Sequence, residues 1–347
     1  VMTSANLSDE PIAFEDDDAR RRLASIADAF LLHNRRIHTR TDDSIARVMA
    51  NRPLLLRRSR GFVPRGIALP AEKSLVLAVG AELKNTICLT RGDRAFLSQH
   101  VGDLKNLEVY DSFRNTISHL QHLLAVEPQR VAHDLHPDYY STRYALENSG
   151  LPAVAVQHHH AHLASCLAEH GLREPAIGVI FDGIGYGVDG HIWGGEFLVG
   201  DLKDYQRLGH LKYQPMPGGD LATRQPWRMA LSYLLGSFGE IPGGLKCFAG
   251  IAEPDLHLVC QAMDRNINTP LTSSCGRLFD AVASILGLRQ VVSFEGQAAM
   301  ELEMLADPGQ STFYPCTLSR RDGLIICDPA EMVASIVKDH LAGVGAE

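Results

Sequence analysis

The sequence predicts an α/β protein of about two domains, in which one strand–turn–strand unit occurs twice. The 347 residues are enough for two domains with cores of their own. The unit occurs first at residues 74–92 (SLVLAVG, AELKN, TICLTRG) and again at residues 176–202 (AIGVIFD, GIGYGVDG, HIWGGEFLVGDL). Two copies about 100 residues apart indicate an internal duplication. Beyond about residue 218 the periodicity is mostly helical.

The residues before the first copy form a separate part of the chain. Residues 1–67 combine a strand at the start (VMTSAN), a helix at residues 17–34 (DDARRRLASIADAFLLHN) and short basic strands. Acidic residues in the first turn of that helix suit the helix dipole. A short linker, PAEKS, follows, and the second part runs over 74–347. Because Val1 lies inside a predicted strand, we expect the chain to be a fragment of a longer protein.

Composition is that of an ordinary globular protein, with 45% hydrophobic and 21% charged residues. The net charge of -8 argues against broad nucleic-acid binding. No apolar run approaches the roughly 20 residues of a membrane span, and no signal peptide is present, so we expect neither nucleic acid nor membrane as a partner. The seven cysteines contain no CxxC pair, which predicts free or buried thiols in a cytoplasmic protein without a zinc knuckle.

Four histidines in five residues, at positions 158, 159, 160 and 162, are hard to explain as packing. The segment that continues from them is helical by its apolar spacing, and residues four apart share a helix face. His158 and His162 are therefore the pair best placed to ligate one divalent metal. His159 and His160 point elsewhere on the helix, where they would contact substrate or orient the ligands. The alternative for the pair is a purely structural role.

Glycine-rich turns in the two copies suggest phosphate binding. Backbone N–H groups approach an anion closely where no Cβ intervenes. Lys84 adds a positive charge beside the first turn, and the second turn follows Asp182 directly. Asp182 would repel phosphate unless a cation lay between them, so we predict it as a third metal ligand. The alternative is that both are ordinary hairpin turns.

A third block, residues 269–283 (TPLTSSCGRLFDAVA), places an acid one helical turn after a glycine. Gly276 would let the backbone approach a ribose, and Asp280 would accept hydrogen bonds from its hydroxyls. The alternative is a helix cap followed by an acid that faces solvent.

These segments together resemble the carbamoyltransferase HypF family, which serves [NiFe]-hydrogenase maturation. Residues 1–67 resemble the end of the family's YrdC-like domain, through the motifs MTSANLSDEP and LRRSRGFVP. Residues 74–347 resemble its transferase domain. That domain has the actin/Hsp70-like (ASKHA) fold, which consists of duplicated ribonuclease-H-like halves. The motifs of the second part are GAELKNT, DLHPDYYSTRYA, VQHHHAHLASCLAEHG, FDGIGYGVDGHIWGGEF, RQPWRMAL, TPLTSSCGRLFDAVA and EGQAAMELE.

The resemblance implies a chemistry. The YrdC-like domain would make carbamoyl-adenylate from carbamoyl phosphate and ATP, and the transferase domain would move the carbamoyl group to the C-terminal cysteine of the maturation protein HypE. It implies zinc or iron on His158, His162 and Asp182, and the catalytic group Lys84. It also implies nucleotide contacts from Ser4, Asn6, Gly183, Gly185, Tyr186, Gly187, Gly276 and Asp280.

Two departures and two alternatives accompany the resemblance. Most of the YrdC-like domain is absent, and the chain stops before the family's NDGG motif, so we expect a further aspartate ligand beyond Glu347. An O-carbamoyltransferase for a small-molecule hydroxyl would carry the same motifs. A non-catalytic nucleotide-binding scaffold is the other alternative.

Overall fold

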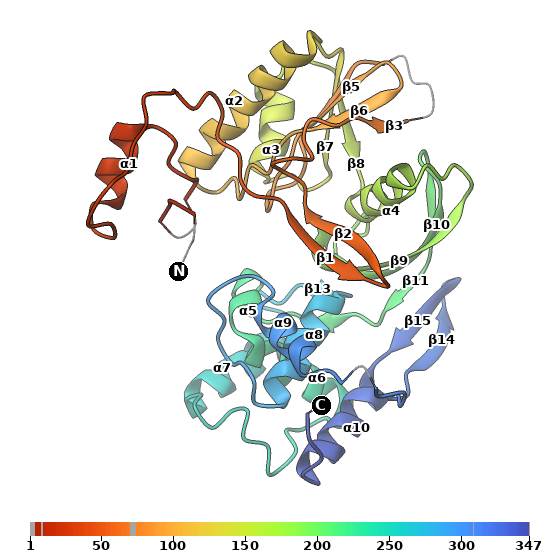
Figure 1. Cartoon of the computed structure of the whole chain (residues 1–347). Helices are drawn as coiled ribbons and strands as arrows, with labels where there is room; N and C mark the ends of the chain where they lie inside the picture. Colours follow the sequence, from red (N-terminus) through yellow and green to blue (C-terminus); the bar gives the residue numbers. More distant parts are fainter. Residues whose placement is uncertain (1–3, 8–9, 70–73, 308, 347) are drawn as a thin grey trace. The chain divides into compact units, whose positions relative to one another are not determined.

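The computed structural model describes residues 4–7, 10–69, 74–307 and 309–346, and these divide into two compact units. Unit 1 is Val1–Val156 with Ala168–Leu172, and unit 2 is Gln157–Leu167 with Arg173–Glu347 (Figure 1). Each unit contains one copy of the repeated strand–turn–strand segment. The domain limits predicted from the sequence, at residues 67 and 74, stay a prediction, and residues 70–73 of the predicted linker lie outside the described residues.

Unit 1 is built on a six-stranded sheet in the order β3-β6-β5-β4-β7-β8. Strands β3 to β6 pair antiparallel, whereas β4, β7 and β8 pair parallel. An antiparallel meander followed by parallel strands is the layout of a ribonuclease-H-like half. The strands are β3 (Ile67–Ala68), β4 (Val76–Ala78), β5 (Cys88–Arg91), β6 (Arg94–Leu97), β7 (Arg130–Asp134) and β8 (Ala153–Val156).

Helix α2 (Leu107–Leu124) supplies most of the helical side of the unit 1 core. Asn106 caps its N-terminus by accepting from two backbone N–H groups. Apolar residues at helical spacing, among them Phe113 and Ile117, are buried with Leu77 and Leu89 of the sheet. Helix α3 (Tyr140–Arg143) and a π-helical turn (Tyr144–Asn148) follow β7.

The first part of unit 1 has fewer buried side chains. Helix α1 spans only Asp16–Leu23, so the longer helix predicted at residues 17–34 is wrong from residue 24 onward. Leu23 is the one buried residue of α1, and Leu31 is fully exposed, so no apolar face holds the continuation helical. Strands β1 (Ile45–Met49) and β2 (Arg52–Arg57) form a separate hairpin. The strand predicted at the start lies partly outside the described residues, and residues 4–7 are irregular.

Unit 2 is built on a seven-stranded sheet in the order β12-β13-β10-β11-β15-β14, with β9 also paired to β10. The long hairpin β9–β10 is the second copy of the repeated segment, and β4–β5 is the first, so both predicted strand–turn–strand units are confirmed. The strands are β9 (Ala176–Tyr186), β10 (Ile192–Gly200), β11 (Tyr205–Leu211), β12 (Gln214–Pro215), β13 (Leu271–Thr272), β14 (Thr317–Arg321) and β15 (Leu324–Asp328).

The helices of unit 2 enclose its main core, as predicted for the chain beyond residue 218. Side chains of α6, α8 and α10 form one buried cluster, with Trp227, Leu231, Leu278 and Val333 among its members. A smaller cluster joins α4 to β9 and β10 through Leu163, Ile180 and Leu198, and holds the start of α4 beside the hairpin. The helices are α4 (His158–Glu169), α5 (Asp220–Arg224), α6 (Pro226–Phe238), α7 (Glu253–Asp264), α8 (Cys275–Ile285), α9 (Gln297–Leu305) and α10 (Ala330–Leu341).

The helices in the described ranges are too short or too polar to cross a membrane.

Candidate metal centre and nucleotide site

Three side chains suited to metal ligation meet in unit 2, where α4 begins beside β9. Single ligand atoms of His158, His162 and Asp182 all lie within 4.8 Å of one another. The two imidazoles lie on one face of α4, with ring centroids 4.9 Å apart, because they are four residues apart. The structure thus brings together the three residues that the sequence predicts as ligands. Their metal-binding role stays a prediction.

The two carboxylate oxygens of Asp182 have different surroundings. Oδ1 accepts the Gly183 N–H at 2.7 Å. Oδ2 is buried, has no hydrogen-bond partner among the described residues, and lies 3.2 Å from His158 Nε2 and 3.8 Å from His162 Nε2. Burial by itself raises the pKa of Asp182, but His158 and His162 lower it more, so the pKa falls below its ordinary value.

That environment fits a divalent cation. The buried Oδ2 lies 3.2 Å from one imidazole nitrogen and 3.8 Å from the other, so one cation could contact all three atoms. Two imidazole nitrogens and one carboxylate oxygen form a donor set that suits zinc or iron.

His159 belongs to this site, contrary to the prediction that it points elsewhere. Its side chain has 0% exposure, and its Nε2 lies 3.7 Å from Asp182 Oδ2. Burial lowers the pKa of His159 to about 3, so the ring is neutral. The prediction is right for His160, whose Nε2 lies 2.9 Å from the Asp201 carbonyl oxygen and whose ring stacks on Tyr205.

The glycines after Asp182 lie mostly in a strand and not in the predicted turn. Strand β9 continues to Tyr186, because Tyr186 and Gly185 still pair with Ile192 and Trp193 of β10. A Cβ on Gly185 would lie 2.4 Å from His159 Cε1, so this glycine leaves room for the ring. Gly187 likewise leaves room for the Trp193 indole, whose Nε1 would lie 2.3 Å from a Cβ there.

Only Gly183 among these glycines faces open space, with no atom within 4 Å of a Cβ built on it. Its N–H is already donated to Asp182. The open space beside the carboxylate is suited to a ligand. The Gly183 N–H, however, is one of the glycine N–H groups predicted to bind phosphate, and its bond to Asp182 removes it from that set. The nucleotide contacts of Gly183, Gly185, Tyr186 and Gly187 stay a prediction.

The start of α8 is fastened to the same strand end. Ser274 caps α8 by accepting the Arg277 N–H, and its hydroxyl lies 2.6 Å from the Gly183 carbonyl oxygen and 3.0 Å from that of Asp182. A Cβ on Gly276 would lie 2.9 Å from Gly183 Cα. Gly276 therefore lets the backbones of α8 and β9 approach each other. The helix cap given as the alternative for this block is therefore confirmed, and Ser274, which the sequence analysis did not name, is the residue that forms it.

Asp280 does not face solvent, so that alternative for it is wrong. Its exposure is 2%, and Oδ2 lies 2.8 Å from Arg277 of the preceding turn. Burial raises the pKa of Asp280, and Arg277 opposes the rise. Helix geometry puts the pair together because the residues are three apart. The ribose contact predicted for Gly276 and Asp280 stays a prediction.

A buried charge network, which the sequence did not reveal, joins β10 and β11 beside the site. Glu196 on β10 has 0% exposure and accepts from Arg207 Nε of β11 at 2.7 Å. The Arg207 guanidinium lies 3.8 Å from the Trp193 ring centroid and also reaches Asp189 at 3.1 Å. Tyr213 donates to the same Asp189 carboxylate. A glutamate in an otherwise apolar strand is the signal that could have found this network.

The remaining predicted site residues belong to unit 1. Lys84 lies in the turn between β4 and β5 with φ 49°, and its N–H donates to Asp103 at 2.7 Å. Ser4 is exposed. The Asn6 amide donates to the Glu10 carbonyl oxygen at 3.1 Å, while its Oδ1 is buried without a partner among the described residues. The roles predicted for these three residues stay predictions.

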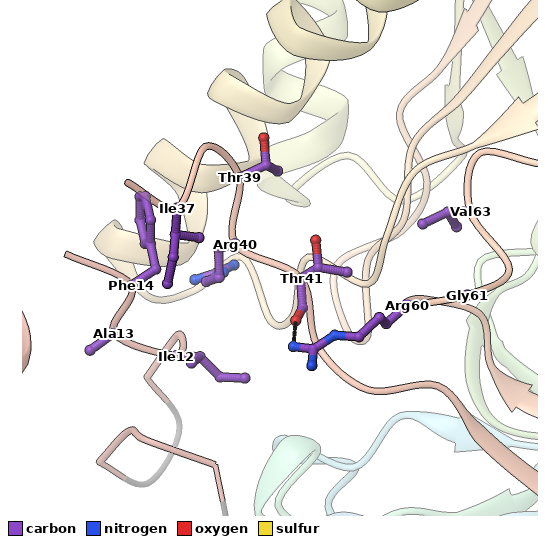
Figure 2. Close-up of a pocket in the computed structure, with 10 residues that line it drawn as sticks. All are labelled: Ile12, Ala13, Phe14, Ile37, Thr39, Arg40, Thr41, Arg60, Gly61 and Val63. Carbon is purple, nitrogen blue, oxygen red and sulfur yellow. Dashed lines mark hydrogen bonds between the residues drawn. The ribbon is translucent and has the colours of Figure 1, made fainter. Parts of the chain in front are cut away.

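Unit 1 also contains a cavity of about 410 Å³, with guanidinium and hydroxyl groups in its wall (Figure 2). Arg60 donates to the Thr41 carbonyl oxygen at 2.9 Å, and Arg40 to that of Val101 at 3.1 Å. Ala13 in the wall donates its N–H to Ala5, between Ser4 and Asn6. The cavity is lined by Ile12, Ala13, Phe14, Ile37, Thr39, Arg40, Thr41, Arg60, Gly61 and Val63.

Three protein-family models match the chain. The model for the second subdomain of the carbamoyltransferase Kae1-like domain matches residues 178–347, and the model for the HypF Kae1-like domain matches residues 71–169. A model of the Sua5/YciO/YrdC type, described as telomere recombination, matches residues 1–59.

Curated proteins of the same kind are similar over most of the chain. Carbamoyltransferase HypF2 of Cupriavidus necator is 51% identical over 315 residues, which are 88% of this chain and 38% of that protein. Carbamoyltransferase HypF of Rhizobium leguminosarum is 47% identical over 305 residues, 88% of this chain and 40% of that protein. The chain thus spans less than half the length of these relatives.

Two solved structures share the fold. A full-length HypF, crystallised in a phosphate- and nucleotide-bound form, superposes with a TM-score of 0.94 at 43% identity, over 99% of this chain and 45% of that one. HypF of T. kodakarensis superposes with a TM-score of 0.89 at 35% identity, over 99% of this chain and 46% of that one. The predicted α/β class, an actin/Hsp70-like region preceded by a YrdC-like segment, is confirmed by these matches. The chain belongs to the HypF family.

Proposed function

We propose that this chain carries the carbamoyl-transfer site of a HypF-type carbamoyltransferase. The carbamoyl group would pass from carbamoyl-adenylate to the C-terminal cysteine thiol of a HypE-type maturation protein. The observation that supports the proposal is the convergence of His158, His162 and the buried Asp182 Oδ2, whose ligand atoms lie within 4.8 Å of one another. Zinc or iron bound there would supply Lewis acidity and offset the negative charge of the adenylate phosphate.

The transfer itself requires little acid catalysis. The acceptor thiolate attacks the carbamoyl carbon, an S–C bond forms, and the C–O bond to phosphate breaks. AMP leaves with the electron pair as a stable phosphate anion. His158, His162 and Asp182 would hold the cation that supplies Lewis acidity, and the open space beside Gly183 would receive the phosphate end of the adenylate.

Unit 1 would take part in making the adenylate from carbamoyl phosphate and ATP. Arginine guanidinium groups and threonine hydroxyls in the wall of its cavity form a set suited to phosphate oxygens. Ser4 and Asn6 adjoin the wall through the Ala5–Ala13 hydrogen bond. The cytoplasmic location predicted from cysteine usage stays a prediction.

The test supplies the purified 347-residue chain with synthetic carbamoyl-adenylate and a HypE-type protein that ends in cysteine. We expect AMP release together with a mass increase of one carbamoyl group on the acceptor. Both should disappear with a chelator, return with zinc or iron, and fail in Asp182→Asn. Asp264→Asn, an exposed carboxylate at the end of α7, is the matched control.

Other outcomes would replace the proposal. Transfer to a small-molecule hydroxyl, with an acceptor whose cysteine is changed to serine left unmodified, would make the chain an O-carbamoyltransferase. Binding of ADP and metal without transfer to any acceptor would make it a nucleotide-binding scaffold.

A further inference from the structure

The amide of Gln157, directly before α4, has a single orientation. Its Oε1 lies 2.9 Å from the backbone nitrogen of His160, which can only donate. Its Nε2 lies 3.2 Å from the backbone carbonyl oxygen of Tyr186, which can only accept. Exchanging the oxygen and nitrogen of the amide would break both contacts. Gln157 Nε2 is therefore the –NH2 group.

That orientation fixes the tautomer of His159. The same Nε2 lies 3.2 Å from His159 Nδ1. Because an –NH2 group has no lone pair to offer, Nδ1 must be the acceptor. In a neutral imidazole the other nitrogen then carries the proton. His159 Nε2 is thus an N–H donor without a lone pair for a metal.

The protonated nitrogen points at the metal centre. His159 Nε2 is buried and has no hydrogen-bond partner within the described ranges, and the same is true of Asp182 Oδ2. These two unsatisfied atoms lie 3.7 Å apart, somewhat longer than the roughly 3 Å of an ordinary N–H···O bond. The absence of a Cβ at Gly185 leaves room for the ring in this position, since a Cβ there would lie 3.0 Å from His159 Nε2.

We infer that His159 is a positioning residue of the metal centre: its Nε2–H faces Asp182 Oδ2 and attracts and orients the carboxylate, and Gln157 selects the tautomer that can do so. The inference deepens the proposed function, because it rests on the metal role of Asp182. His159 thus orients the carboxylate and does not bind the metal, and His158 and His162 remain the two nitrogen ligands.

The tautomer is tested without metal. Nitrogen-15 NMR of the histidine-labelled 347-residue chain distinguishes protonated from unprotonated ring nitrogens, and His159→Gln assigns the His159 signals by their loss. We expect a protonated Nε2 and an unprotonated Nδ1. The opposite tautomer would overturn the inference, whether or not the chain binds metal.

The positioning role is tested by zinc titration of three variants. His159→Leu removes the donor and should weaken zinc binding by roughly 10–100-fold, the range for outer-shell partners of metal ligands. His159→Gln places an amide N–H near the same position and should lose less than about tenfold. Asp182→Asn removes a ligand and should lose more than either.

The results separate the two proposals. Wild-type zinc binding with equal affinity in His159→Leu would overturn the positioning role alone. If His159→Gln lost as much zinc affinity as Asp182→Asn, His159 would be a metal ligand, and this result would also overturn the positioning role. Failure of the wild-type chain to bind zinc, iron or cobalt would overturn the proposed metal centre, with the NMR result unaffected. Thermal unfolding of the metal-free variants checks their folding, and His159→Gln remains decisive where His159→Leu does not fold.

Discussion

Gly276 of α8 packs directly against Gly183 of β9, with no side chain between the two backbones. A Cβ on Gly276 would lie 2.9 Å from Gly183 Cα and 3.2 Å from the Asp182 carbonyl oxygen. The residue suggested for ribose binding therefore also sets the distance between a helix start and the strand end that carries a predicted metal ligand. Packing of α8 and the position of Asp182 are coupled at this point.

Gly276→Ala should destabilise the chain, although alanine favours helix by about 1 kcal/mol over glycine. The added methyl meets backbone atoms that cannot rotate away, and overpacking costs about 1–3 kcal/mol. We expect a small net loss in urea unfolding together with weaker zinc binding. Gly250→Ala is the control, because no atom lies within 4 Å of its Cβ position. Equal stability and zinc affinity in Gly276→Ala and the wild-type chain would contradict the coupling.

Ser274→Ala should have a larger effect than the loss of a helix cap alone. The serine accepts the Arg277 N–H, and its hydroxyl also contacts the carbonyl oxygens of Asp182 and Gly183. Loss of a cap costs about 0.5–2 kcal/mol, and a buried carbonyl left without a donor adds about 1–3 kcal/mol. Urea unfolding should show a loss of about 1.5–5 kcal/mol.

Ser274→Thr keeps the hydroxyl and should recover most of that stability. Ser335→Ala is the control, since its hydroxyl donates only within α10, to Glu331. A threonine variant as unstable as the alanine variant would show that the hydroxyl is not the group that matters.

Arg207→Met should be strongly destabilising, because it leaves Glu196 buried without its cation. Breaking one partner of a buried ion pair costs about 3–5 kcal/mol. Adding Glu196→Gln removes the stranded charge, so the double variant should lose less than the sum of the single losses. A double-mutant cycle by urea unfolding measures the coupling. Arg289→Met is the control: its pair with Glu301 is more exposed, so the free energy of unfolding should change little. Strictly additive losses at Arg207 and Glu196 would contradict a coupling between the two residues.

Local periodicity was enough to predict the parts of the site that depend on one element. The spacing of His158 and His162 on a helix put both on one face, and the end of an apolar strand located Asp182. The actin/Hsp70-like class came from the resemblance of long motifs, whereas the duplication came from the repeated segments themselves.

Contacts between elements could not be predicted in the same way. The glycines after Asp182 read as a turn, because glycine is frequent in turns, but Gly185 makes room for a ring 26 positions earlier in the chain. Glu196 meets Arg207 through the register of β10 and β11, which a bulge between Phe197 and Leu198 shifts. Such pairings depend on the folded register and not on spacing along the sequence.

Metal should stabilise the chain through the three predicted ligands. A ligand that binds only the folded state at 100 times its Kd adds about 2.7 kcal/mol. For a unit of this size that corresponds to a rise in Tm of roughly 5–10 °C. Scanning calorimetry with zinc and with a chelator measures it. Asp182→Asn should abolish most of the difference, and a zinc effect of the same size in that variant would place the binding elsewhere.

Stability should fall in mild acid, in part through His210 of β11. Burial lowers the pKa of His210, and Arg207 lowers it further, while the unfolded chain keeps the ordinary value of about 6.5. Below about pH 6.5 the unfolded state therefore takes up a proton that the folded state does not, so the contribution of His210 is full above that pH and is lost as the pH falls. His210→Asn keeps a donor for the Leu211 carbonyl oxygen and cannot titrate. Urea unfolding between about pH 7.5 and 5 should show a shallower decline in the variant, by up to about 1.4 kcal/mol per pH unit. An unchanged slope in His210→Asn would show that His210 is protonated equally in the folded and unfolded states.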